Sequence, residues 1–390
     1  MIKYSSNFKY IHEIVRLIKK NFKRTKMSLH EPCFNGNEWK YLKNCLDSNE
    51  VSTIGKYVNS FEGMLCDYTK SKYCISTVNG TSALHVAMIL SNIGLDDQVL
   101  MPAFNFVATA NAARYLGANP IFVDIEQKTL GIDPEKLKLF LKKNTYQHNK
   151  QCINKKNNKV IKALVLLHAF GHPSNISEIL KIVKNNNIKL IEDAAEAIGS
   201  KYYDKHVGTF GDLGIISFNG NKTITTGGGG AILTNSSVLA KKAKHITTTS
   251  KIIHPWKYNH DQIGFNYRMP NINAAIGCAQ LEQLEGFIKK KRMLFGRYKT
   301  IFSNIKNIKI FEEPKNCRSN YWLNALIFEK TNKGIKNKFI SFCHKNNILV
   351  RPVWELLNNL KYLKKFEKDD LVSSKDMYSK TVNLPSSVFL

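Results

Sequence analysis

The amino-acid sequence predicts an α/β fold: a mostly parallel central sheet with helices on both faces, followed by a smaller C-terminal α/β domain. From about residue 37 to residue 234, strand-like and helix-like segments alternate, which is the pattern of parallel strands joined by helices. After about residue 250, one long helical segment precedes three strand-like segments. We therefore place a large domain at residues 1–250 and a small C-terminal domain at residues 251–390.

The strands predicted for the large domain are short and apolar. They lie at 72–78, 98–102, 120–125, 161–168, 188–194, 213–218 and 231–234. Helices are predicted at 37–46, 59–68, 81–90, 105–116, 133–141 and 177–187. Asp133 followed by Pro134 is typical of a helix start. The basic, asparagine-rich segment 142–159 is expected to form a surface hairpin or loop.

The C-terminal region predicts one helix at 269–302 and strands at 308–313, 320–328 and 346–353. A further short helix is expected at residues 8–20, where Ile11, Ile14, Val15 and Ile18 would share one face. Such a helix can lie on a membrane surface. We favour a helix that docks on the rest of the protein.

The net charge of +28 raises the question of a nucleic-acid partner. The charge is carried mostly by dispersed lysines, whereas arginine is the better fork for phosphates and bases. We therefore expect no specific nucleic-acid binding, although an anionic small-molecule substrate would gain from this field.

Several function classes are disfavoured by composition. The eight cysteines form no CxxC pair, so we expect neither a metal site nor a disulfide framework. No apolar run reaches the roughly 18 residues of a membrane span. The first residues lack the apolar core and cleavage site of a secretory signal. Reduced thiols in a cytoplasmic protein are the expectation.

In a parallel sheet, ligands bind at the carboxyl ends of the strands. Gly80, Thr81 and Ser82 follow the strand 72–78 and begin a helix, where free N–H groups attract an anion. An ordinary helix cap is the alternative. Phe104 and Phe106 follow the strand 98–102, and one of them could stack on a flat ring, or both could be core residues.

Two further strand ends carry charged residues. Asp193 lies at the end of the strand 188–194. A carboxylate buried there needs a cationic partner, such as a protonated ring nitrogen. The alternative is that Asp193 simply caps a helix. Lys222 lies in the turn after the strand 213–218, before glycines 227–230. Together, an anion cradle, an aromatic plate, an aspartate and a lysine match the needs of pyridoxal 5'-phosphate.

At these motifs the sequence resembles the nucleotide-sugar aminotransferases of the DegT/DnrJ type, which share the aspartate-aminotransferase fold. The resemblance covers residues from about 30 to the C-terminus. It is carried by the stretches NGTSALH, PAFNFVATANA, VDIEQKTLGIDPEKL, LLHAFGHP, IEDAAEAIGS, GTFGDLGIISFNGNKTITTGGGGAIL, GFNYRMPNINAAIGCAQLEQL and NLPSS. It implies the type I fold of pyridoxal-phosphate-dependent transferases.

Three shorter motifs resemble one branch of this family, which serves legionaminic acid and related diamino-sugar pathways. They are FNGNK at 218–222, HPW at 254–256 and LHEP at 29–32. The branch implies amination of C4 of a nucleotide-linked 4-keto-6-deoxy-2-acetamido sugar, with glutamate as the usual donor. A perosamine-type or other 4-amino sugar, and a catalytically silent basic binding protein, remain as alternatives. A dehydratase is disfavoured because Lys222 is present.

The resemblance also implies residue roles around the cofactor. Lys222 would form the Schiff base and shuttle protons, Asp193 would pair with the ring nitrogen, and Phe106 would stack on the ring. Glu196 would lie near the ring hydroxyl, where an acid repels a phenolate unless it is protonated. The remaining cofactor contacts would come from Gly80, Thr81, Ser82, Ser217 and Asn219.

For other residues, the resemblance implies contacts with a second subunit or with the sugar. Asn266 would reach the phosphate of the neighbouring subunit's cofactor, so the working unit would be a homodimer with shared sites. Substrate contacts are implied for Ser52, Thr53, His168, His254, Trp256, Tyr267 and Arg268. Glu50 stands where relatives commonly carry a bulky residue, and it would either alter sugar preference or point to solvent.

Overall fold

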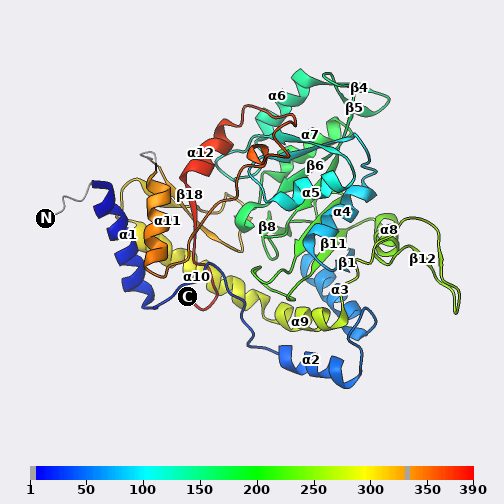
Figure 1. Ribbon diagram of the computed structural model, residues 1–390, viewed down its shortest axis with the longest axis horizontal. Coiled ribbons are helices and arrows are strands. Elements are labelled where there is room, and N and C mark those ends of the chain that lie inside the picture. Colours follow the sequence, from blue (N-terminus) through cyan, green and yellow to red (C-terminus); the bar gives the residue numbers. More distant parts are fainter. Residues whose placement is uncertain (1–5, 330–333) are drawn as a thin grey trace.

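The computed structural model describes residues 6–329 and 334–390 (Figure 1). Its centre is a nine-stranded sheet with the main strand order β1-β11-β10-β7-β6-β2-β3. Neighbours from β10 to β3 pair in parallel, and β11 alone on this path runs opposite, pairing antiparallel with β1 and β10. The α/β class and the mostly parallel central sheet are confirmed.

The strands lie close to their expected positions. The main ones are β1 (Tyr73–Thr77), β2 (Gln98–Pro102), β3 (Asn119–Val123), β6 (Val160–Leu167), β7 (Lys189–Asp193), β10 (Leu213–Ser217) and β11 (Gly230–Thr234). The basic insert forms the hairpin β4 (Thr145–His148) and β5 (Gln151–Asn154), which pairs with the start of β6. A surface hairpin was one of the two forms expected for this segment.

Helices cover both faces of the sheet because successive strand residues point to opposite sides. In β7, Leu190 packs into one core and Ile191 into the other. The first core is covered by α2 (Glu38–Asp47), α3 (Lys56–Thr69), α6 (Pro134–Asn144), α7 (Ile176–Asn185) and α9 (Asn271–Glu282). The second is covered by α4 (Gly80–Leu90), α5 (Val107–Tyr115) and α8 (Ser237–Thr247).

Helix α6 starts as its sequence predicts. The Asp133 side chain accepts hydrogen bonds from the N–H groups of Glu135 (2.9 Å) and Lys136 (3.2 Å), and Pro134 occupies the first turn. These bonds satisfy N–H groups that have no partner within the helix.

The prediction of a single helix at 269–302 is wrong. The segment forms α9 and α10 (Leu284–Phe302), which are separated at Gln283. The Gln283 N–H bonds to the carbonyl of Gln280, three residues back, which tightens the turn. Its side chain donates to the buried carboxylate of Glu38 (2.8 Å), so a tertiary contact holds the break. No proline or glycine marks this position in the sequence.

The C-terminal region contains a four-stranded antiparallel sheet. Its order is β14 (Ile308–Ile310), β16 (Asn324–Phe328), β18 (Thr381–Leu384) and β17 (Arg351–Pro352). The strands expected at 308–313, 320–328 and 346–353 are therefore present but shorter, and β18 was not expected.

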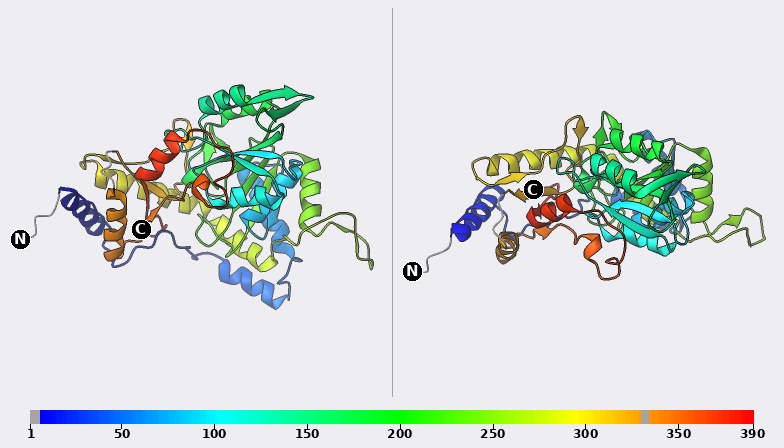
Figure 2. Two further views of the ribbon diagram at one scale, coloured as in Figure 1. Left: turned by 45° about the horizontal axis from the view of Figure 1, so that its top comes forward. Right: turned by 90° about the horizontal axis from the view of Figure 1, so that it is seen from above.

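The N-terminal helix α1 (Ser6–Phe22) packs on this C-terminal region, beside α10 and α11 (Ile335–Lys345) (Figures 1 and 2). Ile11, Ile14, Val15 and Ile18 are buried in the same core as Tyr298. Its apolar face is thus covered by protein. Across residues 6–329 and 334–390, no helix is long and apolar enough to cross a membrane.

Packing crosses the expected boundary at residue 250, and the division into two domains stays a prediction. Helix α9 packs on α2 and α3, although it lies after the boundary in sequence. Strand β15 (Cys317–Arg318) pairs with β8 (Lys201–Tyr202). The segment leading into β16 is therefore held against the large region, close to the strand ends that carry the candidate site.

Candidate active site

A cavity of about 320 Å³ lies where the carboxyl ends of β1, β2, β6, β7 and β10 meet. Eight of the residues predicted to bind the cofactor line it: Gly80, Thr81, Phe106, Asp193, Glu196, Ser217, Asn219 and Lys222. These residues span more than 140 positions of the chain, and the parallel strand direction brings them to one edge of the sheet.

The start of α4 forms one wall of the cavity and is built for close backbone approach. Asn79 caps the helix, and its side chain accepts from the N–H of Ser82 (2.7 Å). A Cβ at Gly80 would lie 3.0 Å from the Ser217 Cβ, and one at Gly230 would lie 2.5 Å from the Asn79 carbonyl carbon. Glycine at both positions lets β10, β11 and α4 converge around a helix N-terminus, which is a site that favours phosphate.

Ser82 is placed differently from Gly80 and Thr81. Its N–H is used by the Asn79 cap, its side chain is buried, and the residue is not part of the cavity wall. Of the three hydroxyl residues predicted to hold the phosphate, Thr81 and Ser217 line the cavity.

Asp193 ends β7 inside the cavity and is almost fully buried. Its carboxylate accepts from the Thr109 hydroxyl (2.8 Å) and the Ala195 N–H (3.3 Å). Burial raises the pKa of this carboxyl, and these hydrogen bonds act against the rise. Within the described residues it forms no ion pair of 4 Å or less, so a cationic N–H from a ligand would supply the missing counter-charge.

Lys222 projects into the cavity from the loop after β10. Its Nζ lies 3.4 Å from Glu196 Oε1 and 4.0 Å from the ring centroid of Trp322. The Lys222 N–H bonds to the Asn219 carbonyl (2.9 Å), which closes the turn that carries the lysine. The side chain is mostly buried, so this lysine is not an ordinary solvated loop residue.

Glu196 is the partner of Lys222 and is also buried. Its second oxygen accepts from the Phe170 N–H (2.9 Å). Burial raises the pKa of this carboxyl to about 7, against the opposing effect of the Lys222 charge. A carboxyl with this pKa is partly protonated at neutral pH, which reduces the repulsion expected between an acid here and a phenolate.

The two phenylalanines after β2 have separate positions. Phe106 is the N-cap residue directly before α5, lines the cavity and is 52% exposed, so its ring is available for stacking. Phe104 is fully buried and packs edge-on against Phe170 and Trp354. Phe106 is therefore the candidate ring-stacking residue, and Phe104 belongs to the core.

His168 does not face the cavity as we expected. It is fully buried; its Nδ1 accepts from the Ser174 N–H (3.2 Å), and its Nε2 lies 3.1 Å from Glu192 Oε2. Because Nδ1 accepts, Nε2 carries the proton and donates to Glu192. Both ring nitrogens are thus used inside the protein, and His168 holds the strand ends together instead of meeting a substrate.

The other expected substrate residues lie outside the cavity of their own chain. Their positions are as follows: Ser52 and Thr53 are on a loop held by α9, His254 and Trp256 are between β12 (Lys251–Ile252) and β13 (Asn259–His260), and Tyr267 and Arg268 are beside the end of β1. The β12–β13 arm projects away from the body (Figure 2). Asn266 is exposed and accepts hydrogen bonds from Arg268.

Among the wall residues that the sequence analysis missed, three have side chains that matter for the site: Asn105, Trp322 and Trp354. Trp322 and Trp354 reach the cavity from the C-terminal region, more than 90 positions away from Lys222. Asn105 is fully buried, and neither its amide oxygen nor its amide nitrogen has a partner within the described part of the chain. Its place directly before Phe106, after a strand end, was the available signal. The tryptophans have no such signal, because their strands were not expected to meet the large sheet.

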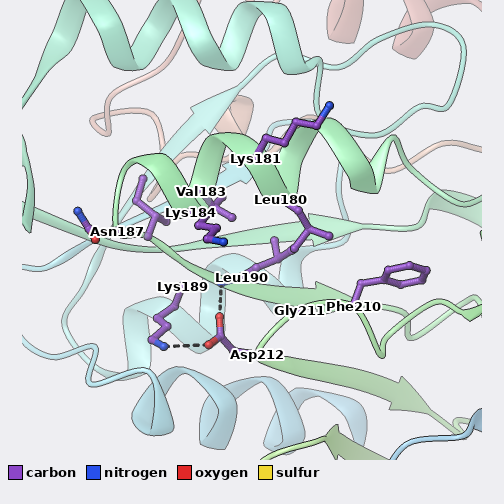
Figure 3. Close-up of a pocket in the computed structure, with 11 residues that line it drawn as sticks. Leu180, Lys181, Val183, Lys184, Asn187, Lys189, Leu190, Phe210, Gly211 and Asp212 are labelled. Carbon is purple, nitrogen blue, oxygen red and sulfur yellow. Dashed lines mark hydrogen bonds and ion pairs between the residues drawn. The ribbon is translucent and has the colours of Figure 1, made fainter. Parts of the chain in front are cut away.

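A second cavity, of about 650 Å³, lies beside α7 at the opposite, amino-terminal end of β7 (Figure 3). Asp212 is the only acid of its wall, and it pairs with Lys189 (2.8 Å) and accepts from the Leu190 N–H (3.0 Å). With that carboxylate satisfied, this cavity offers no group poised for acid–base or covalent chemistry.

Comparison with known proteins agrees with this geometry. Residues 32–390 match the model of the DegT/DnrJ/EryC1/StrS aminotransferase family. The chain belongs to this aminotransferase family. It is 35% identical to a GDP-perosamine synthase of Escherichia coli O157:H7 over 92% of each chain.

Further relatives agree with the assignment. The aminotransferase is 33% identical to a UDP-4-amino-4,6-dideoxy-N-acetyl-beta-L-altrosamine transaminase of Campylobacter jejuni, over 70% of each chain. A putative sugar aminotransferase of Streptococcus pneumoniae, solved in its PLP form, has the same fold: the TM-score is 0.84 over 94% of each chain, at 19% identity.

The cofactor of the aminotransferase is pyridoxal phosphate, and the cavity fits it. The glycine-lined start of α4 suits the phosphate, the exposed face of Phe106 suits the ring, and the unpaired Asp193 suits a protonated ring nitrogen. When bound, the cofactor supplies a carbonyl that amines attack and a ring that accepts electrons. Lys222, which lines the same cavity, would be the amine that binds it.

We predict that Glu196 makes the stability of the cofactor-free protein depend on pH. Its folded pKa of about 7 is above the unfolded value of 4.5, so the folded state holds the proton more tightly. The stabilisation that Glu196 gives the folded state is fully present below pH 4.5. The free energy of unfolding then decreases by about 3 kcal/mol as the pH rises through 7. In unfolding measurements from pH 4.5 to 8, Glu196→Gln should remove this slope relative to wild type. The exposed Glu178→Gln is the control, and parallel curves for wild type and Glu196→Gln would contradict the assignment.

Proposed function

We propose that this aminotransferase transfers an amino group to C4 of a nucleotide-linked 4-keto-6-deoxy-2-acetamido sugar. Glutamate is the proposed donor, and the 4-amino sugar would serve legionaminic-type nonulosonate or surface-glycan synthesis in the cytoplasm. The observation that carries the proposal is the single cavity in which Lys222 lies with Asp193, Phe106 and the start of α4.

The chain's own residues have distinct tasks in this proposal. Lys222 binds the cofactor through Nζ and, once released, carries a proton between the donor's α-carbon and the cofactor. Asp193 keeps the ring nitrogen protonated, since a buried carboxylate strongly favours an adjacent cation. Glu196, with a pKa of about 7, can hold or release a proton 3.4 Å from Lys222 Nζ.

The identity of the sugar has two candidates. The sequence motifs FNGNK, HPW and LHEP favour the 2-acetamido sugar, and the Campylobacter relative is named for an N-acetylated 4-amino sugar. The GDP-perosamine synthase relative matches a larger share of the chain, 92% against 70%. A perosamine-type product therefore fits equally well and is kept as the second candidate.

A panel of 4-keto nucleotide sugars separates the two candidates. We expect glutamate-dependent amination, seen by mass spectrometry as replacement of the keto oxygen by an amine, with the UDP-linked 2-acetamido 4-keto-6-deoxy sugar. Faster turnover of the GDP-linked 4-keto-6-deoxymannose would replace the legionaminic-type proposal by the perosamine type. Failure to aminate any 4-keto sugar would contradict both.

The role of Lys222 can be tested against a catalytically silent protein. The purified wild type should be yellow, with an absorbance band at about 410–430 nm. Lys222→Ala should lack this band, and its turnover should fall by a factor on the order of 10⁴ or more. It should still retain cofactor noncovalently through Thr81, Ser217 and Asp193. The exposed Lys181→Ala is the matched control. A colourless wild type that takes up no added cofactor would remove the enzyme proposal.

The working unit in this proposal is a homodimer with shared sites. Large apolar side chains on and beside the β12–β13 arm are strongly exposed: Ile253, Trp256, Tyr258 and Ile263. Exposed apolar residues gathered on one projecting arm are typical of a surface that another chain covers. Residues near the arm, among them His254, Trp256 and Asn266, would then complete the partner's cavity.

Mixing two inactive variants tests the shared site. Lys222→Ala and Asn266→Ala should each be inactive as homodimers. Random reassortment makes half of the dimers hybrid, and each hybrid holds one intact site, so activity should recover to about a quarter of wild type. A mixture of Lys222→Ala with Lys222→Ala/Asn266→Ala is the control and should recover none. Absence of recovery after demonstrated subunit exchange would contradict sharing.

A further inference from the structure

We propose that Trp322 is a positioning residue for Lys222: it fixes the loop that carries the lysine and gives the free ammonium group a defined place at the cavity wall. The inference rests on the proposed role of Lys222 and deepens it. Trp322 belongs to the C-terminal region, so this contact makes the placement of the reactive lysine depend on how that region packs.

Two contacts connect Trp322 to neighbouring residues of the loop. Its indole Nε1 donates to the carbonyl of Asn221 (2.6 Å). The face of the same ring lies 4.0 Å from Lys222 Nζ. The first contact fixes the backbone directly before the lysine, and the second fixes the end of its side chain. A rigid group that touches both ends leaves the four-carbon stem little freedom.

Trp322 is itself held firmly. Its backbone N–H donates to the side-chain oxygen of Asn320 (2.8 Å), and its backbone carbonyl accepts from Lys291 Nζ (3.0 Å). Lys291 is fully buried and also donates to the Ser386 carbonyl (2.7 Å). The Asn320 side chain donates in turn to the Glu196 carbonyl (2.9 Å). The tryptophan is thus anchored to both regions of the molecule.

The chemistry of the ring suits an ammonium group that is temporarily without its covalent partner. A cation over an indole face is attracted by the ring quadrupole, and this attraction is strongest where water is excluded. Glu196 Oε1, at 3.4 Å, is the other group that contacts Lys222 Nζ. Between them, carboxyl and indole hold the amine at the wall, from which it can return to the same reacting atom in each cycle.

The test compares the rate of cofactor attachment in protein that has Lys222 with the noncovalent affinity for the cofactor in protein that lacks it. In cofactor-free protein, Trp322→Leu should slow the appearance of the band at about 410–430 nm by about 10- to 100-fold, because the amine is no longer held in place. Trp322→Phe keeps a ring but loses the N–H, and it should fall between wild type and Trp322→Leu. In the Lys222→Ala background, Trp322→Leu should leave the noncovalent affinity for pyridoxal phosphate unchanged within about 2-fold.

Trp354→Leu is the matched control, because Trp354 lines the same cavity and stacks on Phe170 (ring centroids 4.9 Å apart). Its effect on cofactor affinity should be the same with and without Lys222. Equal loss of affinity from Trp322→Leu in both backgrounds would overturn the inference, since Trp322 would then act on the cofactor directly.

Hydrogen exchange of the cofactor-free protein gives a readout that needs neither colour nor turnover. Amides of residues 219–226 should exchange faster in Trp322→Phe and Trp322→Leu than in wild type and Trp354→Leu. Unchanged exchange would overturn the backbone part of the inference. A wild type that stays colourless with added pyridoxal phosphate would instead overturn the proposed function, so the two failures are distinguishable.

Discussion

The common direction of the parallel strands is the constraint on which the candidate site depends. Because β1, β2, β6, β7 and β10 run the same way, their carboxyl ends open at one edge of the sheet. The antiparallel β11 then returns through Gly230 against the start of α4, which narrows that edge into a cavity. Moving any one of these strands by a single residue would turn its site side chain to the other face.

Burial gives the charged groups of this cavity their properties. Asp193, Glu196 and Lys222 are all largely shielded from solvent, so their charges interact strongly, and burial raises the pKa of both carboxyls. The two acids nevertheless have different surroundings. Asp193 accepts from the Thr109 hydroxyl and, among the described residues, forms no ion pair of 4 Å or less, whereas Glu196 contacts the Lys222 ammonium. Glu196 is therefore matched to a lysine of the chain itself, and Asp193 is the carboxylate that we propose to meet a ligand's charge.

The sequence predicted those features that follow from strand ends, and it failed where a residue's role depends on distant packing. Gly80, Phe106 and Lys222 follow short apolar strands and Asp193 ends one, so the topology alone places them together. His168 also ends a strand, but its ring turns inward to Glu192. Trp322 reaches the cavity from the segment that leads into β16, and the Gln283 side chain at the break between α9 and α10 contacts Glu38; no local pattern encodes either.

The residues of the candidate cofactor site and the residues proposed to contact the sugar lie in different parts of the fold. The residues that line the candidate site lie at or just after strand ends of the large sheet, apart from Trp322 and Trp354, which come from the C-terminal region. The loop at 48–55 and the β12–β13 arm, which carry the proposed sugar contacts, lie outside the cavity of their own chain. A sheet edge is a rigid scaffold, whereas loops and arms can change without disturbing it. The residues of the candidate site are therefore held by the rigid part of the fold, and the proposed sugar contacts lie on segments that can vary more freely.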